Sequence, residues 1–261
     1  MTHLMLSSPR KNLMPRNTGF APTIIISIAL ISSLSDCSGS GGGSPMGAAP
    51  ASIGGNYSGS LEDSVAGSGS VGLSITQSGS RISGQFADTF SNPAIDNGGS
   101  LSGTVTGSTF SGSVKSVFVG ACGFSIKGSL SGSTLSGTYS ATSCSGVETG
   151  TFSVTTFTPP SVAGTYSGTE VDSIAGSGSL SATVTQSGSV LGGSYSNSFG
   201  GSGTVFGQFV NSGTALFALL PPSASDCPGV ASATINPPTI SGSYEAVYCS
   251  VSDTGTFTLT L

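Results

Sequence analysis

Carboxylates are the side chains of this chain with the most potential for chemistry. They occur in two similar phrases, Glu62-Asp63 and Glu170-x-Asp172. Two neighbouring acids can serve in acid–base catalysis or bind calcium, but neither phrase continues with the ligand spacing of an EF-hand loop. The simpler interpretation is that these carboxylates cap turns, as acidic side chains often do.

Other catalytic groups are scarce in the sequence. The only histidine is His3, which lies in a segment that we expect to be removed. Serines are plentiful, but a serine nucleophile needs an activating base and none is evident. We therefore predict that the protein is not an enzyme, and that it holds no metal and no cofactor.

The chain contains two copies of one sequence, residues 52–157 and residues 161–261, joined by a linker at 158–160. Ser52–Phe86 superposes on Ser161–Tyr195 at an offset of 109 residues, with 18 identities in 35 positions. Further along, the offset falls to 105 residues. A repeat of this length matches a small domain, so each copy should have its own core.

Four of the five cysteines occupy matching places in the copies. Cys122 and Cys144 of the first copy correspond to Cys227 and Cys249 of the second. Four cysteines allow three pairings, and we favour a disulfide within each copy, because duplicated domains normally keep their own bridge. Cys37 is then left unpaired, and disulfides indicate an exported protein.

The N-terminus has the plan of a secretory signal. Arg10, Lys11 and Arg16 precede the apolar run Ala21–Leu34, which is too short to span a bilayer comfortably. We predict a signal peptide over residues 1–36.

The end of this segment, Leu34-Ser-Asp-Cys37, resembles the lipobox of bacterial lipoproteins. The resemblance implies that Cys37 becomes the lipidated first residue of the mature chain and carries a fatty acid such as palmitate. It implies a protein of the cell envelope held to the membrane by its lipid, on the outer membrane or facing the periplasm. Residues 37–51, rich in Gly and Ser, would form a flexible tether. The alternative is an ordinary secretory signal followed by an unrelated cysteine.

Beyond residue 52 the pattern is that of short strands joined by tight turns. Apolar residues alternate with Ser, Thr and Gly, and we find no sustained helical periodicity. Each copy contains about eight such strands, which implies an antiparallel meander. Hairpins are clearest where two strands flank a Gly-containing turn, as in Leu101–Val105 with Phe110–Val114 and Ile126–Leu130 with Leu135–Tyr139.

A glycine lies between two bulky residues in several of these strands, for example in Ile82–Phe86 and Leu191–Tyr195. Such a glycine shares a face with its bulky neighbours and suits a backbone that bends or approaches another closely. A sheet that closes on itself has this need. We predict an all-β protein of two tandem eight-stranded antiparallel up-and-down β-barrels, with two β-sandwiches as the alternative.

Gly55-Asn-Tyr57, Gly164-Thr-Tyr166 and the strand Leu135–Tyr139 resemble the calycin barrels, avidins and lipocalins. The chain has no tryptophan, so the aromatic box with which avidins bind biotin is absent. The four matching tyrosines should face inward, where they either pack in the core with a locally bonded hydroxyl or contact a ligand at the barrel mouth. These residues are Tyr57, Tyr139, Tyr166 and Tyr244.

Charge and composition limit the partners. Only 7% of residues are charged, and beyond residue 36 three basic residues face ten acidic ones, which makes nucleic-acid binding unfavourable. We predict a non-catalytic envelope lipoprotein that binds a small molecule in a barrel. Alternatives are a structural or adhesive envelope protein and an inhibitor of exported proteases. No protein partner is indicated.

Overall fold

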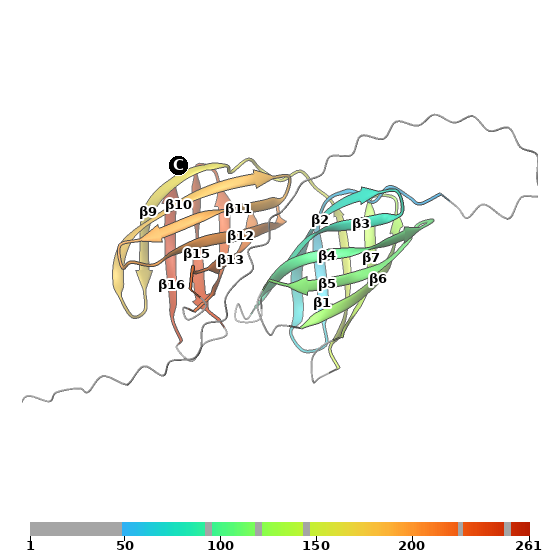
Figure 1. Ribbon diagram of the computed structural model, residues 1–261, viewed down its shortest axis with the longest axis horizontal. Helices are drawn as coiled ribbons and strands as arrows, with labels where there is room; N and C mark the ends of the chain where they lie inside the picture. Colours follow the sequence, from blue (N-terminus) through green and yellow to red (C-terminus); the bar gives the residue numbers. More distant parts are fainter. Residues whose placement is uncertain (1–48, 92–95, 118–121, 143–146, 224–226, 248–251) are drawn as a thin grey trace, which may run out of the picture. The chain divides into compact units, whose positions relative to one another are not determined.

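The computed structural model describes residues 49–91, 96–117, 122–142, 147–223, 227–247 and 252–261. These residues form two closed antiparallel barrels of eight strands each, in tandem along the chain (Figure 1). The predicted fold class is confirmed. The alternative of two β-sandwiches is wrong, because the first and last strands of each barrel pair with one another.

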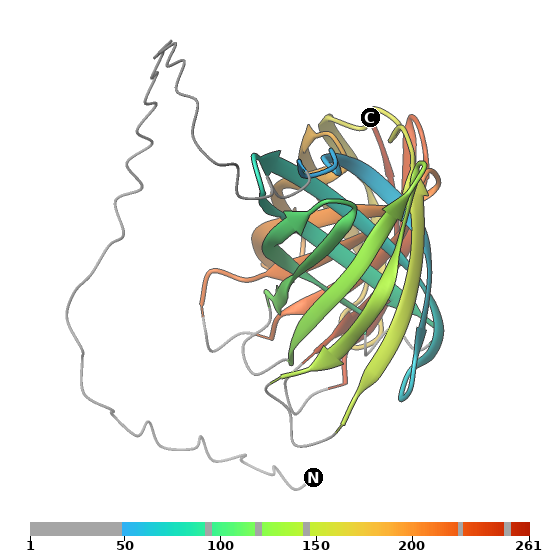
Figure 2. The ribbon, with the colours of Figure 1, turned by 90° about the vertical axis from the view of Figure 1, so that its right-hand side faces the viewer.

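The first barrel is an up-and-down meander in which each strand pairs with the next, and β8 returns to β1. Its tilted strands are seen in Figure 2. The strands are β1 (Gly55–Asp63), β2 (Gly67–Ser78), β3 (Arg81–Phe90), β4 (Asn97–Thr106), β5 (Thr109–Ser116), β6 (Gly123–Ser131), β7 (Thr134–Ala141) and β8 (Thr149–Thr156).

The second barrel repeats this topology, with β16 returning to β9. Its strands are β9 (Gly164–Asp172), β10 (Gly176–Ser187), β11 (Val190–Asn197), β12 (Ser202–Asn211), β13 (Thr214–Leu220), β14 (Gly229–Asn236), β15 (Thr239–Ala246) and β16 (Thr254–Thr260).

Alternation along the strands builds each interior. Because side chains point to opposite faces in turn, every second residue of a strand lies inside the barrel. In β2 these residues are Val71, Leu73 and Ile75, which are buried in the core of the first barrel. Ser and Thr fill most of the outward positions. Their hydroxyl groups make the surface polar although few of its residues are charged.

The recurring glycines stand where strands approach one another closely. A Cβ atom added to Gly84 in β3 would lie only 1.9 Å from the carbonyl oxygen of Ser74 in β2. The equivalent Gly193 in β11 has a φ of +144°, and its added Cβ would lie 1.8 Å from the carbonyl oxygen of Thr183. No residue with a Cβ atom fits at either position, which explains why both positions are glycine.

The predicted hairpin of Ile126–Leu130 with Leu135–Tyr139 is confirmed as β6 and β7, in which Leu130 lies opposite Leu135 and Ile126 opposite Tyr139. Regular bonding continues to Thr142, whose N–H donates to the carbonyl oxygen of Gly123. Cys122 therefore lies just before the regular part of the hairpin.

The cysteine pairing itself stays a prediction. Cys122 and Cys227 are each in a disulfide bond. Their predicted partners, Cys144 and Cys249, lie outside the described residues, as do the signal peptide and Cys37.

Residues of both barrels share a third apolar cluster within the compact unit Pro45–Leu261. Its buried members come from the outer faces of strands and from loops, and they are Ala87, Val210, Leu216, Ala218, Val230 and Val247. Asn56 of β1 also bonds the second barrel, because its Oδ1 accepts the Ser189 N–H at 3.2 Å and the Ser189 hydroxyl at 2.9 Å. Each barrel nevertheless keeps its own core cluster.

Candidate functional site

The interior of the second barrel contains a cavity of about 370 Å³, whereas that of the first barrel contains only about 100 Å³. Apolar side chains line most of the larger cavity, and a few polar groups gather among them. The apolar residues include Leu180, Val184, Val205, Phe217, Leu219, Ile240, Phe257 and Leu259, and the polar residues are Glu170, Asp172, Tyr195, Asn197, Tyr244 and Asp253.

Three replacements between the copies favour the larger volume in the second barrel. Each exchanges a large inward side chain of the first barrel for a small one at the equivalent place in the second, and all six residues line their cavities. The exchanges are Leu73 for Ala182, Phe124 for Gly229 and Ile126 for Ala231.

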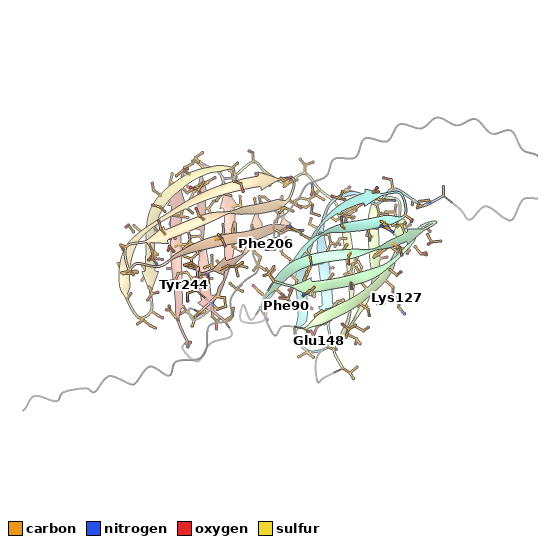
Figure 3. All side chains as sticks on the ribbon, viewed as in Figure 1. Phe90, Lys127, Glu148, Phe206 and Tyr244 are labelled. Carbon is orange, nitrogen blue, oxygen red and sulfur yellow. The ribbon has the colours of Figure 1, made fainter. Side chains whose placement is uncertain are left out.

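A tyrosine and an aspartate form the same bond in both barrels. The Tyr139 hydroxyl donates to Asp63 Oδ2 at 2.6 Å, and the Tyr244 hydroxyl donates to Asp172 Oδ2 at 2.7 Å. Tyr244 comes from β15, and its label in Figure 3 marks it within the second barrel. Because the acceptor is a carboxylate, each bond is stronger than one between neutral groups.

Both aspartates also cap turns, as their sequence context predicted. Asp63 Oδ1 accepts the N–H groups of Val65 and Ala66 at 2.7 and 2.8 Å. Asp172 Oδ1 accepts those of Ile174 and Ala175 at 2.8 and 2.6 Å. The two carboxylates end β1 and β9, so each joins a turn to the rim of its cavity.

These bonds set the ionisation of the first-barrel rim. Burial acts to raise the pKa of Asp63, but the bonds from Tyr139, Ala66 and Val65 outweigh it and hold that pKa below its ordinary value. Burial and the charge of Asp63 raise the pKa of the nearby Glu148, which also bonds Asp63. Glu148, labelled in Figure 3, therefore takes up a proton more readily than Asp63 does.

Two further acids of the first barrel have raised pKa values. Asp96 is only 5% exposed, and burial raises its pKa to about 7 although its Oδ1 accepts the Phe90 N–H at 2.7 Å. Burial, followed by the charge of Asp96, raises the pKa of Asp88 well above its ordinary value. Asp88 Oδ1 accepts the Asn97 N–H at 3.0 Å.

Glu170 has no acidic counterpart in the first barrel. It lies in β9 at the position that Leu61 occupies in β1, and only 3% of it is exposed. Its Oε1 atom has no hydrogen-bond partner among the described residues. Burial, and then the charge of Asp172, raise the pKa of this carboxyl.

The predicted ligand-lining tyrosines fall into two groups. Tyr139 and Tyr244 line the cavities of their barrels. Tyr57 and Tyr166 are buried elsewhere, with hydroxyls that donate to the carbonyl oxygens of Ile53 at 3.1 Å and Val162 at 3.0 Å, and they are not among the lining residues.

Glu62 and Glu170 look equivalent in the sequence, but they lie on opposite faces of their strands. Glu62 is exposed and accepts a bond from the Ser68 hydroxyl at 2.7 Å. Glu170 is one residue earlier in the repeat, so alternation turns it inward. The signal was present in the alignment of the copies, where an interior leucine becomes a glutamate.

The described residues contain no helix long and apolar enough to cross a membrane. Within the same residues, no group of three or more His, Cys, Asp and Glu side chains is arranged to hold a metal ion.

The chain matches no protein-family model and no curated protein. Among solved structures, an outer membrane protein candidate from Bacteroides fragilis has 16% identity and a TM-score of 0.29, over 80% of this chain and 98% of that chain. Isotype 1 transferrin binding protein B from Neisseria meningitidis has 10% identity and a TM-score of 0.28, over 79% of this chain and 76% of that chain.

A protein of unknown function from Nostoc punctiforme has 10% identity and a TM-score of 0.26, over 80% of this chain and 96% of that chain. Likeness at these scores supports no statement about what this chain binds or does.

Proposed function

We propose that the chain is a non-catalytic, lipid-anchored protein of the bacterial cell envelope, and that its second barrel binds a small, largely apolar molecule. The observation that carries the binding role is the cavity of about 370 Å³ in that barrel. Ligand sites in proteins are concave, mostly apolar and typically about 300–1,000 Å³ in volume, with a few polar groups that fix orientation.

The first barrel has a different role in this proposal. Its cavity of about 100 Å³ is below the size typical of ligand sites, and Leu73, Phe124 and Ile126 occupy the space that is open in the second barrel. We assign the first barrel a structural role between the tether and the binding barrel.

The envelope location is supported by the sequence alone. The basic N-terminus, the apolar run and the lipobox-like Leu34–Cys37 agree with the two matched cysteine pairs, which suit an oxidising compartment. The proposal that the protein is not an enzyme is supported by the lack of histidine beyond His3.

The binding role is tested by filling the cavity. The double variant Ala182→Leu/Ala231→Ile restores the residues of the first barrel at two lining positions. We expect N-phenyl-1-naphthylamine, a neutral apolar fluorophore, to bind the native protein with increased emission, and the double variant to lose at least about tenfold in affinity. The matched control is Thr183→Leu, which adds a similar volume on the exposed face of β10 and should leave binding unchanged.

Cavity filling commonly stabilises a protein by about 0.5–2 kcal/mol, so a melting temperature at or above that of the native protein would show that the variant is folded. A native protein that does not bind the fluorophore, or a folded double variant that binds it equally well, would contradict the proposal.

A further inference from the structure

Glu170 and Asp172 face the same cavity at two depths. They are two residues apart in β9, so both side chains point inward and lie about 7 Å apart along the strand. Asp172 ends the strand at the turn, and Glu170 lies deeper. Both line the cavity of the second barrel.

The fold does not require a carboxylate at this depth. The first barrel closes with the same topology and has the buried Leu61 at the equivalent position. A buried carboxylate oxygen without a hydrogen-bond partner costs free energy, on the order of 1–3 kcal/mol or more. Glu170 is therefore a destabilising choice for the empty barrel, and a bound partner would offset that cost.

All the charged residues that line the cavity are acidic. Asp172 and Asp253 line it together with Glu170, and the second copy contains no lysine or arginine. The Tyr244 hydroxyl is already committed to Asp172, and the Asn197 side chain bonds Glu170 without neutralising it. Apolar walls of low dielectric strengthen the attraction of such carboxylates for a cation.

We propose that the second barrel selects molecules with a cationic amine on an apolar body, and that Glu170 binds the amine while the apolar walls hold the body. This inference rests on the proposed binding role and adds the chemical class of the ligand. The amine would donate to the unpartnered Oε1 atom, and Glu170 would be the residue that distinguishes the second barrel from the first in specificity.

Three probes that share a phenyl ring on a two-carbon chain test the selection: 2-phenylethylamine, 2-phenylethanol and 3-phenylpropanoate at pH 7. Each is titrated as a competitor of N-phenyl-1-naphthylamine on the full chain, with isothermal calorimetry as a direct check. We expect the amine to bind at least about tenfold more tightly than the alcohol, because hydrogen bonds to charged groups are worth about 1.5–3 kcal/mol. The carboxylate should bind most weakly.

Two variants locate the effect. Glu170→Gln keeps the shape and removes the charge, and Glu170→Leu installs the residue of the first barrel. Both should lose the preference for the amine over the alcohol and should still bind the fluorophore. The control is Glu245→Gln, because Glu245 follows the cavity-lining Tyr244 in β15 and so points outward, and it should keep the preference.

The outcomes separate the two proposals. If the fluorophore binds but the alcohol competes as well as the amine, or if the preference survives in Glu170→Gln, the selection of amines is wrong and the binding role stands. If the fluorophore itself does not bind the native chain, both are wrong. Glu170→Gln removes a buried charge and Glu170→Leu removes the buried polar group altogether, so both variants should melt no lower than the native protein.

Discussion

At the scale of single residues, the two copies have kept one polar motif and changed its surroundings. The tyrosine–aspartate bond of Tyr139 and Asp63 recurs as Tyr244 and Asp172, with the same turn capped by each aspartate. The leucine-to-glutamate exchange at the next inward position then changes the chemistry of the cavity. In the proposed function, the shared rim and the different interior let one barrel be structural and the other bind a ligand.

The acids of the first barrel predict an unusual dependence of stability on pH. Asp96 has a pKa raised from an ordinary 3.8 to about 7 by burial, so the folded protein binds its proton more tightly than the unfolded chain does. The stabilisation is complete below about pH 4 and is lost as the pH rises through 7. At about 1.4 kcal/mol per pKa unit, this amounts to on the order of 2–4 kcal/mol.

We expect the urea midpoint to fall between pH 5 and pH 8, and Asp96→Asn to flatten that fall while its amide oxygen still accepts the Phe90 N–H. Asp88, Glu148 and Glu170 have raised pKa values and act in the same direction, whereas Asp63 has a lowered pKa and acts in the opposite one. An unchanged slope in Asp96→Asn would contradict this assignment.

At the scale of strands, glycine makes the close approaches that barrel closure needs. Gly192 and Gly193 are neighbours in β11 with opposite environments. A Cβ on Gly193 would lie 1.8 Å from a backbone oxygen, in a backbone conformation that side chains rarely adopt, whereas the nearest atom to a Cβ on Gly192 is the side-chain oxygen of Thr185 at 3.3 Å. One position excludes a side chain, and the other allows one with a small adjustment.

We therefore expect Gly193→Ala to destabilise the protein by about 3 kcal/mol or more, because the strands must separate to admit the methyl group. Gly192→Ala should change stability by less than about 1 kcal/mol. Chemical denaturation of the two single variants makes the comparison, and equal effects would show that the closeness of β11 to β10 does not restrict this strand.

The sequence predicted the strands well, because alternation and glycine placement are local patterns. Leu191–Tyr195 was predicted as a strand with a close backbone contact at its glycine, and β11 has both. The candidate site could be predicted less well from the sequence. Tyr57 and Tyr139 look alike in the repeat, and only the fold shows that one hydroxyl bonds Ile53 while the other reaches Asp63, 76 residues away. Asp88 and Asp96 gave no signal, because their burial depends on strands that are distant in the chain.

At the scale of the whole molecule, the proposal describes a binding barrel displayed beyond a packed one on a lipid-anchored tether. Residues 37–51 are rich in Gly and Ser, and the proposed flexible tether of this length would have an average end-to-end distance of roughly 20 Å. A reach of this size would hold the barrels clear of the membrane surface and leave the cavity of the second barrel accessible to small molecules.

The anchor gives the last prediction. We expect the full chain, produced in a bacterial host supplied with labelled palmitate, to take up the label and to sediment with the membrane fraction. Cys37→Ala should lose both properties, because a thiol at this position is the proposed site of acylation, and the barrels should still fold and bind N-phenyl-1-naphthylamine. The neighbouring Ser38→Ala is the matched control and should remain labelled. A label that persists in Cys37→Ala, or an unlabelled native chain in the soluble fraction, would mean that Cys37 merely follows an ordinary secretory signal.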